Sequence, residues 1–231
     1  MGEKVVDIRD VTIRYEKDGA PAIDGISFSI SNEEKIAMLG LNGSGKTTLL
    51  KALVGLLPFS GKIEVCGIEL RKKTISEIRE KIGYIMDVPE DQILFPIVID
   101  DVTFSLRRRG VGQIEARKEA MDILVALEAE NLISMPVHHL SHGQKQRVAL
   151  AGAMISKPPI LLLDEPSQGL DPPGKKRLAA FLKGTNSAVL IATHDLKFAR
   201  KVCSRFMVLD RGRLVYDGDY SEEALADFDE G

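Results

Sequence analysis

A glycine-rich stretch, GLNGSGKTT at residues 40–48, carries the clearest chemistry in the sequence. The apolar run 36–39 before it predicts a buried strand, and residues 49–54 after it predict a helix. Strand, loop and helix are the context in which the pattern GxxxxGK[ST] binds phosphate, because the backbone N–H groups and the helix N-terminus face the anion. Lys46 can reach the β- and γ-phosphates, and the Thr47 hydroxyl can hold Mg²⁺. This stretch therefore predicts a nucleoside-triphosphate site.

Two acids follow a second apolar run. Residues 161–163 are all leucine and predict a strand that ends at Asp164 and Glu165. At a strand tip, Asp164 can hold Mg²⁺ through its water shell, and Glu165 can polarise an attacking water. Alone, the motif is also common as a strand followed by a polar turn. The phosphate loop upstream favours the catalytic interpretation.

The segment LSHGQKQR at residues 140–147 precedes an apolar helical run at 148–155. Ser141 is a natural N-cap, and Gly143 allows the backbone to approach a phosphate closely. A second helix N-terminus aimed at an anion would suit a γ-phosphate. From this motif alone, an ordinary capped helix is the better interpretation.

The remaining patterns describe the elements that must position these residues. Alternation of apolar and polar residues predicts a small antiparallel sheet, with strands at 5–15, 26–30 and 61–65. Runs at 81–86, 160–163, 188–192 and 206–209 predict buried, largely parallel strands separated by helices. Between residues 89 and 156 only helical spacing is found, at 100–108 and 114–127. We therefore expect a helical subdomain inserted into an α/β core.

The composition is that of an ordinary globular chain, with 231 residues, 44% hydrophobic and 28% charged. A net charge of −3 gives no electrostatic reason to expect nucleic acid as a partner. Cys66 and Cys203 lack metal-type spacing, which favours a reducing compartment. No signal-peptide pattern and no apolar run of ~20 residues is present, so any membrane role is expected to come through a partner.

Taken in order, these motifs resemble the ATP-binding cassette (ABC) ATPases over essentially the whole chain. The order is the phosphate loop, LSHGQ, LLLDEP, a turn at 169–171, and His194 after a strand. The resemblance implies an α/β P-loop NTPase fold, with a RecA-like mixed-sheet core, an antiparallel β subdomain and an inserted α-helical subdomain. It implies one nucleotide-binding domain over 1–231, divided into core and β subdomain at about 1–86 and 158–231 and a helical subdomain at 87–157.

The same resemblance implies roles for individual residues. In this family an aromatic residue at the position of Tyr15 stacks on adenine, and the acid at Asp171 belongs to the loop that spans a dimer interface. The residues implied to bind nucleotide are Tyr15, Asn42, Gly43, Ser44, Gly45, Lys46, Thr47 and Thr48, and in the opposite subunit Ser141, His142, Gly143 and Gln144. Those implied in catalysis are Lys46, Asp87, Glu165 as general base and His194 on the γ-phosphate; those implied to hold Mg²⁺ are Thr47, Asp87 and Asp164. A strand-surface Tyr15 and a structural His194 are the plainer alternatives.

Two positions depart from the family pattern. The family usually has Gly where His142 stands, so this side chain would crowd the interface or add a donor. His138, His139 and His142 also suggest a metal site, but no carboxylate or Cys completes a ligand set at suitable spacing. The family usually has Gln where Asp87 stands; Asp adds a negative charge near the γ-phosphate but can coordinate Mg²⁺. We hypothesise an active ATPase with altered metal and pH dependence, with a weakened or regulatory site as the alternative.

Residues 87–95, DVPEDQILF, resemble the segment after the Gln loop of energy-coupling-factor (ECF) importers, including the cobalt and nickel type, and residues 96–102 fit the same outline. The resemblance implies a subunit at the cytoplasmic face of the membrane that binds a second ABC ATPase and transmembrane subunits, and powers import of a vitamin or a transition-metal ion. The arginines 107–109 are then a solvated charge run or a partner contact.

Other functional classes stay open at this point. One is the ATPase subunit of another ABC importer or exporter, which differs only in its membrane partner. Another is a soluble ABC ATPase of repair, cluster assembly or translation, which usually carries large insertions or tandem cassettes that this sequence lacks. A purely structural ATP-binding module is the weakest, supported only by Asp87 and His142.

Overall fold

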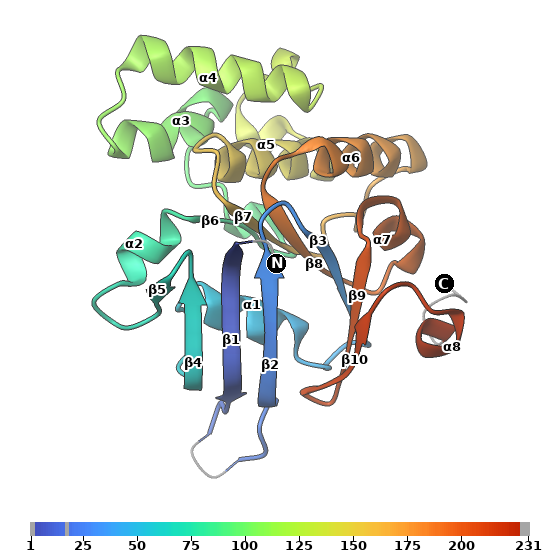
Figure 1. The fold of residues 1–231 in the computed structure, drawn as a ribbon. Coiled ribbons are helices and arrows are strands. Elements are labelled where there is room, and N and C mark those ends of the chain that lie inside the picture. The colour runs from blue at the N-terminus through green and yellow to red at the C-terminus, as the bar shows by residue number, and fades with distance from the viewer. Residues whose placement is uncertain (1–2, 17–18, 227–231) are drawn as a thin grey trace.

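Two sheets and a group of helices make up the protein (Figure 1). The computed structural model describes residues 3–16 and 19–226. The larger sheet has six strands in the order β10-β9-β3-β8-β7-β6. Their bounds are Arg213–Gly218, Arg205–Asp210, Lys35–Leu39, Ala188–Thr193, Ile160–Asp164 and Ile82–Ile85. All neighbours are parallel except the edge pair β9 and β10, so the sheet is mixed.

The central strands of the larger sheet, β9, β3, β8 and β7, are buried on both faces, as their continuous apolar runs predict. Successive side chains of β3 alternate between two hydrophobic cores: Ile36 and Met38 face one, and Ala37 and Leu39 face the other. Helix α1 (Lys46–Leu53) and the smaller sheet pack on the first face. Helices α6 (Pro172–Gly184) and α7 (Leu196–Val202) pack on the second face together with the helical group.

The smaller sheet confirms the predicted antiparallel group. Its order is β2-β1-β4-β5, with bounds Ile23–Ser31, Lys4–Ile13, Ser60–Val65 and Ile68–Glu69. Strand β1 pairs antiparallel with both β2 and β4. The short helix α2 (Ile75–Arg79) leads from this sheet into β6.

A helical group lies above the sheets in Figure 1 and is formed by α3, α4 and α5. Their bounds are Val98–Arg108, Gln113–Ala126 and His142–Met154. The 3₁₀ turn η1 (Pro89–Asp91) lies between β6 and α3, and two more, η2 (Glu130–Leu132) and η3 (Val137–His139), lie between α4 and α5. Among the described residues, the segment 89–156 contains no strand, only one isolated bridge between Ile97 and Pro136. These helices fall inside the segment 87–157, whose exact boundaries as a subdomain stay a prediction.

Candidate active site

The carboxyl ends of β3, β8 and β7 lie along one edge of the larger sheet. The parallel register pairs Leu39 of β3 with Thr193 of β8, and Asp164 of β7 with Ala192 of β8. The phosphate loop follows β3 directly, and His194 follows β8. Strand β6, which precedes Asp87, is paired parallel to β7 on its other side. The topology therefore gathers the predicted catalytic segments at one edge, where open α/β sheets bind ligands.

The phosphate loop is shaped by glycines that no other residue can replace. Gly45 has φ +108°, and a Cβ there would lie 2.7 Å from the carbonyl oxygen of Ala22. At Gly40 a Cβ would lie 2.6 Å from the carbonyl oxygen of Leu209. Left-handed residues in such a turn direct consecutive N–H groups to one side, which forms an anion-binding nest ahead of α1.

Lys46 begins α1 and is buried, with 6% of its surface exposed. Its ammonium group donates to the carbonyl oxygens of Gly40 at 2.6 Å and Leu41 at 3.3 Å, so it lies across the loop. Burial lowers the pKa of Lys46, and the nearby carboxylates of Glu165 and Asp164 oppose that shift. A desolvated cation at this place is a strong partner for phosphate oxygens.

Asp164 is the best-supported metal ligand. It is 1% exposed, and neither carboxylate oxygen has a hydrogen-bond partner among the described residues. Burial raises its pKa to about 6; Thr47 and Lys46 oppose the shift, while the Asp87 and Glu165 carboxylates add to it. An unpartnered buried carboxylate is costly unless a cation compensates for it. The donor set of carboxylate and hydroxyl oxygens therefore fits Mg²⁺.

Glu165 and His194 are brought into direct contact. Glu165 has φ +45°, a left-handed conformation that is costly for a non-glycine residue and typical of functional turns. One carboxylate oxygen lies 2.9 Å from Nδ1 of His194, and the other accepts a hydrogen bond from the Thr193 hydroxyl at 2.8 Å. Thr193 was not singled out from the sequence, although it immediately precedes His194. Side by side, the two side chains can face a water and the end of a phosphate.

Tyr15 contacts the helix that follows the phosphate loop. The residue is 66% exposed, and its hydroxyl lies 2.9 Å from the Thr48 hydroxyl of α1. An exposed ring tethered to the phosphate-loop helix suits stacking on a base, so its role in adenine binding stays a prediction.

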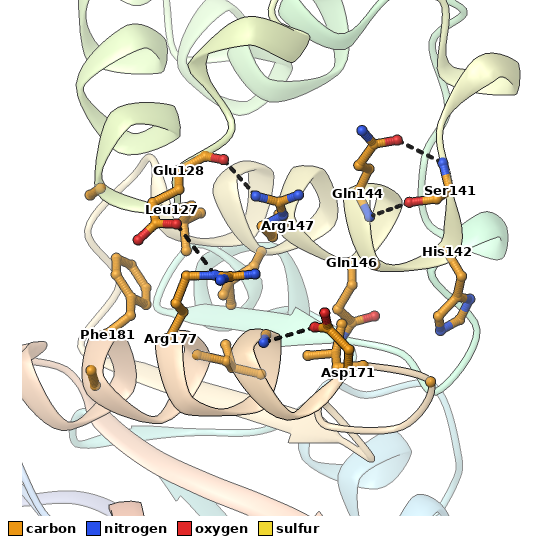
Figure 2. A pocket seen from close by; sticks show the side chains of 18 residues that line it. Leu127, Glu128, Ser141, His142, Gln144, Gln146, Arg147, Asp171, Arg177 and Phe181 are labelled. Carbon is orange, nitrogen blue, oxygen red and sulfur yellow. Dashed lines mark hydrogen bonds and ion pairs between the residues drawn. The ribbon is translucent and has the colours of Figure 1, made fainter.

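The segment LSHGQ and Asp171 form a second group, on the helices of the opposite face from α1. A pocket of about 580 Å³ lies between α5, α6 and the end of α4 (Figure 2). Ser141 and Gln144 form a capping box at the start of α5, which confirms the predicted N-cap. Asp171 caps α6 through the Gly174 amide at 2.8 Å. Within one chain, these residues are thus grouped with each other and not with the phosphate loop.

The sequence also did not predict the contacts that surround Asp195. Lys175 of α6 pairs with Asp195 at 2.6 Å, and Ser167 donates to the same carboxylate at 3.3 Å. Burial works to raise the pKa of Asp195, but Lys175, the Phe198 amide and Ser167 together lower it. These contacts join the loop after β7 to the loop after β8. Since they link residues far apart in the sequence, no local pattern predicts them.

Comparison with known proteins decides the family. A family model described as ABC transporter matches residues 23–168. The chain belongs to the ABC transporter family. As an ABC cassette it is an ATP-binding and ATP-hydrolysing subunit.

Its relatives include ATPases of known transporter types. It is 38% identical to the energy-coupling factor transporter ATP-binding protein EcfA of Carboxydothermus hydrogenoformans, over 94% of this chain and 81% of that protein. The structure of cbiO1 from Clostridium perfringens, part of the ABC transporter complex cbiONQ, superposes with a TM-score of 0.86 and 33% identity, covering 97% and 91% of the two chains. The dimeric cassette MJ0796 in a post-hydrolysis state with ADP and Pi gives 0.84 and 27% identity, covering 93% and 98%. The α/β P-loop fold and the ECF-type resemblance are confirmed.

The described residues contain neither a His/Cys/Asp/Glu metal cluster nor a membrane-spanning helix. Among residues 3–16 and 19–226, no group of three or more His, Cys, Asp or Glu side chains is arranged to hold a metal ion. His138 and His139 instead contact each other, with ring centroids 4.2 Å apart. In the same described part of the chain, every helix is too short or too polar to span a bilayer.

Proposed function

We propose that this cassette powers an ECF-type importer, in which two cassettes sandwich two ATP molecules and drive a membrane partner. The observation that carries the catalytic part is the convergence of Lys46, Asp164, Glu165 and His194 at one sheet edge. The importer part is supported by the names of the EcfA and cbiO1 relatives and by the segment 87–95.

Each residue has a distinct part in hydrolysis. The backbone of the loop 42–48 and Lys46 hold the phosphates and offset the charge that develops in transfer. Thr47, Asp164 and Asp87 would hold Mg²⁺, which would offset negative charge on the phosphates. Glu165 orients the attacking water, and His194, already 2.9 Å from Glu165, contacts the γ-phosphate.

The second half of each site comes from the other cassette. Ser141, His142, Gly143 and Gln144 present the start of α5 to the partner's ATP, and Asp171 lies at the interface. Their place on the face opposite α1 supports this, because they do not reach the phosphate loop of their own chain. A family member of known structure, MJ0796, is itself a dimer.

We propose that a membrane partner docks on the surface between α3 and β6. A small pocket of about 190 Å³ there is lined by Arg79, Tyr84, Ser105 and Arg108, among others. The hydroxyls of Tyr84 and Ser105 are buried without a hydrogen-bond partner in the described residues. In the arginine run, Arg107 pairs with Asp100 at 3.7 Å and Arg109 donates to the Glu80 carbonyl. We place the subunit peripherally at the cytoplasmic face of the membrane, through this surface.

The test is to purify a tagged copy from its native membranes in mild detergent and identify what is recovered with it. An ECF-type transmembrane scaffold with a substrate-binding membrane subunit is the expected result, and it would also name the cargo. Transmembrane subunits of another type would assign the cassette to a different importer or exporter. Recovery of soluble proteins alone, at every ATP state, would contradict the importer and favour a soluble ABC ATPase.

A further inference from the structure

His142, which stands where the family usually has glycine, turns its imidazole toward a loop of its own chain (Figure 2). This loop, residues 165–171, joins β7 to α6, and its Gly169 has φ +70°. A Cβ on Gly169 would lie 2.8 Å from Cδ2 and 3.1 Å from Nε2 of His142. The ring therefore packs directly on the Gly169 backbone and leaves no space for a side chain there.

Glu90 faces the other side of the imidazole. This residue belongs to η1, in the segment after β6, and its Oε1 lies 3.9 Å from Nδ1 of His142. The same oxygen accepts a hydrogen bond from Lys145 at 3.0 Å, and Lys145 lowers the pKa of Glu90. Since His142 and Lys145 are three residues apart on α5, one carboxylate faces both of them.

The first turns of α5 contact the loop after β7 at further points. The Gln146 side chain is buried and donates to the Pro166 carbonyl at 3.3 Å. A Cβ on Gly143 would lie 3.2 Å from a methyl carbon of Leu170. One stretch of α5 is thus joined to two segments that are far apart in the sequence, the turn after β6 and the loop after β7.

We propose that His142 is a positioning residue that locks the loop 167–171 to the LSHGQ segment and to Glu90 of the same chain. The lock presents two parts of the dimer interface, the start of α5 and Asp171, to the partner as one unit. This proposal depends on the ATPase dimer proposed above, but not on the assignment of the cassette to an importer. The contact itself lies within one chain, so its presence can be tested without nucleotide or partner.

The test is hydrogen–deuterium exchange of the nucleotide-free full-length chain, followed on peptides that cover residues 165–172. His142→Ala removes the ring without placing a flexible glycine in α5. We expect exchange in the loop 167–171 to become about tenfold faster. His139→Ala is the matched control, because His139 is an exposed histidine three residues earlier, and it should leave the loop unchanged.

Two more variants separate the ring from its polar partner. His142→Phe keeps a ring over Gly169 and should restore most of the protection, whereas His142→Asn keeps a polar group and should not. Glu90→Gln should have a smaller effect than His142→Ala, because it removes only the charge that orients the ring. In turnover assays, His142→Ala should lower kcat about three- to tenfold, while the affinity of the monomer for a fluorescent ATP analogue is unchanged.

Unchanged exchange in His142→Ala would overturn the lock. If His142→Ala instead speeds exchange throughout the chain, His142→Phe becomes the deciding variant. Slow exchange at 167–171 in His142→Phe would support the lock, and fast exchange there would contradict it. An unchanged kcat with a faster loop would contradict the positioning role at the interface. A failed dimer or importer assignment would leave the exchange result intact, so the failures are distinguishable.

Discussion

The edge of the larger sheet and the start of α5 are both rich in predicted site residues, but they are built differently. At the sheet edge, the proposed catalytic side chains bond to one another or are buried together: Glu165 contacts His194, and Lys46 lies near Asp164. At the start of α5, the side chains of Ser141 and Gln144 bond to each other's backbone, and both residues line a pocket. The first region has the groups needed to bind a nucleotide within one chain. The second has a preorganised helix end that needs a partner.

This difference predicts that substitutions in the two regions impair different steps of the ATPase cycle. Changes at the sheet edge should impair nucleotide binding by the monomer or the chemical step itself. Changes at the start of α5 should leave nucleotide binding by the monomer intact and impair the assembled pair.

Of the three variants that compare the two regions, Lys46→Ala is expected to have the largest effect. This change removes the buried ammonium group that lies across the phosphate loop, so turnover should fall about 10²- to 10³-fold and binding of a fluorescent ATP analogue should weaken strongly. Lys51→Ala, on the last turn of the same helix, is the control and should bind nucleotide normally. Tight nucleotide binding by Lys46→Ala would contradict the assignment of the loop.

Ser141→Ala should lower turnover less than Lys46→Ala does, and it should act after nucleotide binding, in the assembled pair. The loss of a hydroxyl that meets a charged phosphate should lower turnover about tenfold or more, with nucleotide affinity of the monomer unchanged. It also removes a helix cap, which costs about 1 kcal/mol of stability. Ser221→Ala is the matched control, because Ser221 caps α8 in the same way but lies outside the segment. Weakened monomer binding in Ser141→Ala would remove the distinction between the two regions.

The smallest effect is expected for Asp87→Gln, which restores the residue usual in the family. The negative charge of Asp87 adds to the raised pKa of Asp164, so its removal lowers that pKa. A carboxyl group is ionised above its pKa, and Asp164 must be ionised to hold Mg²⁺. The acid side of the pH–rate profile should therefore move to lower pH, with an altered Mg²⁺ requirement. A variant with unchanged rate, Mg²⁺ dependence and pH profile would contradict the hypothesis.

The sequence predicted the fold well wherever local patterns decide the structure. Apolar runs located β3, β7, β8 and β9, since strands buried on both faces read as continuous hydrophobic segments. Strand β10 was missed, because an edge strand with alternating half-exposed and exposed residues carries charged side chains and resembles a loop. Helix α2 has only five residues, too few for a periodic signal.

The site was predicted as a set of motifs but not as a set of contacts. Glu165 meets Thr193 only because β7 and β8 are parallel neighbours in a particular register, which no single segment encodes. For the same reason the contact of His142 with Gly169 could not be foreseen, because the two residues are brought together by the packing of α5 beside the loop after β7.

The most direct test of the account is Glu165→Gln in the full-length chain. The account predicts that this variant binds ATP with normal affinity, hydrolyses it ~10²- to 10⁴-fold more slowly, and accumulates as a dimer when ATP and Mg²⁺ are added. Turnover and size-exclusion chromatography with light scattering measure both effects, with Glu115→Gln on the exposed side of α4 as the control. Near-normal turnover in Glu165→Gln would contradict the assigned base, and a persistent monomer with ATP bound would contradict the division of the site between two chains.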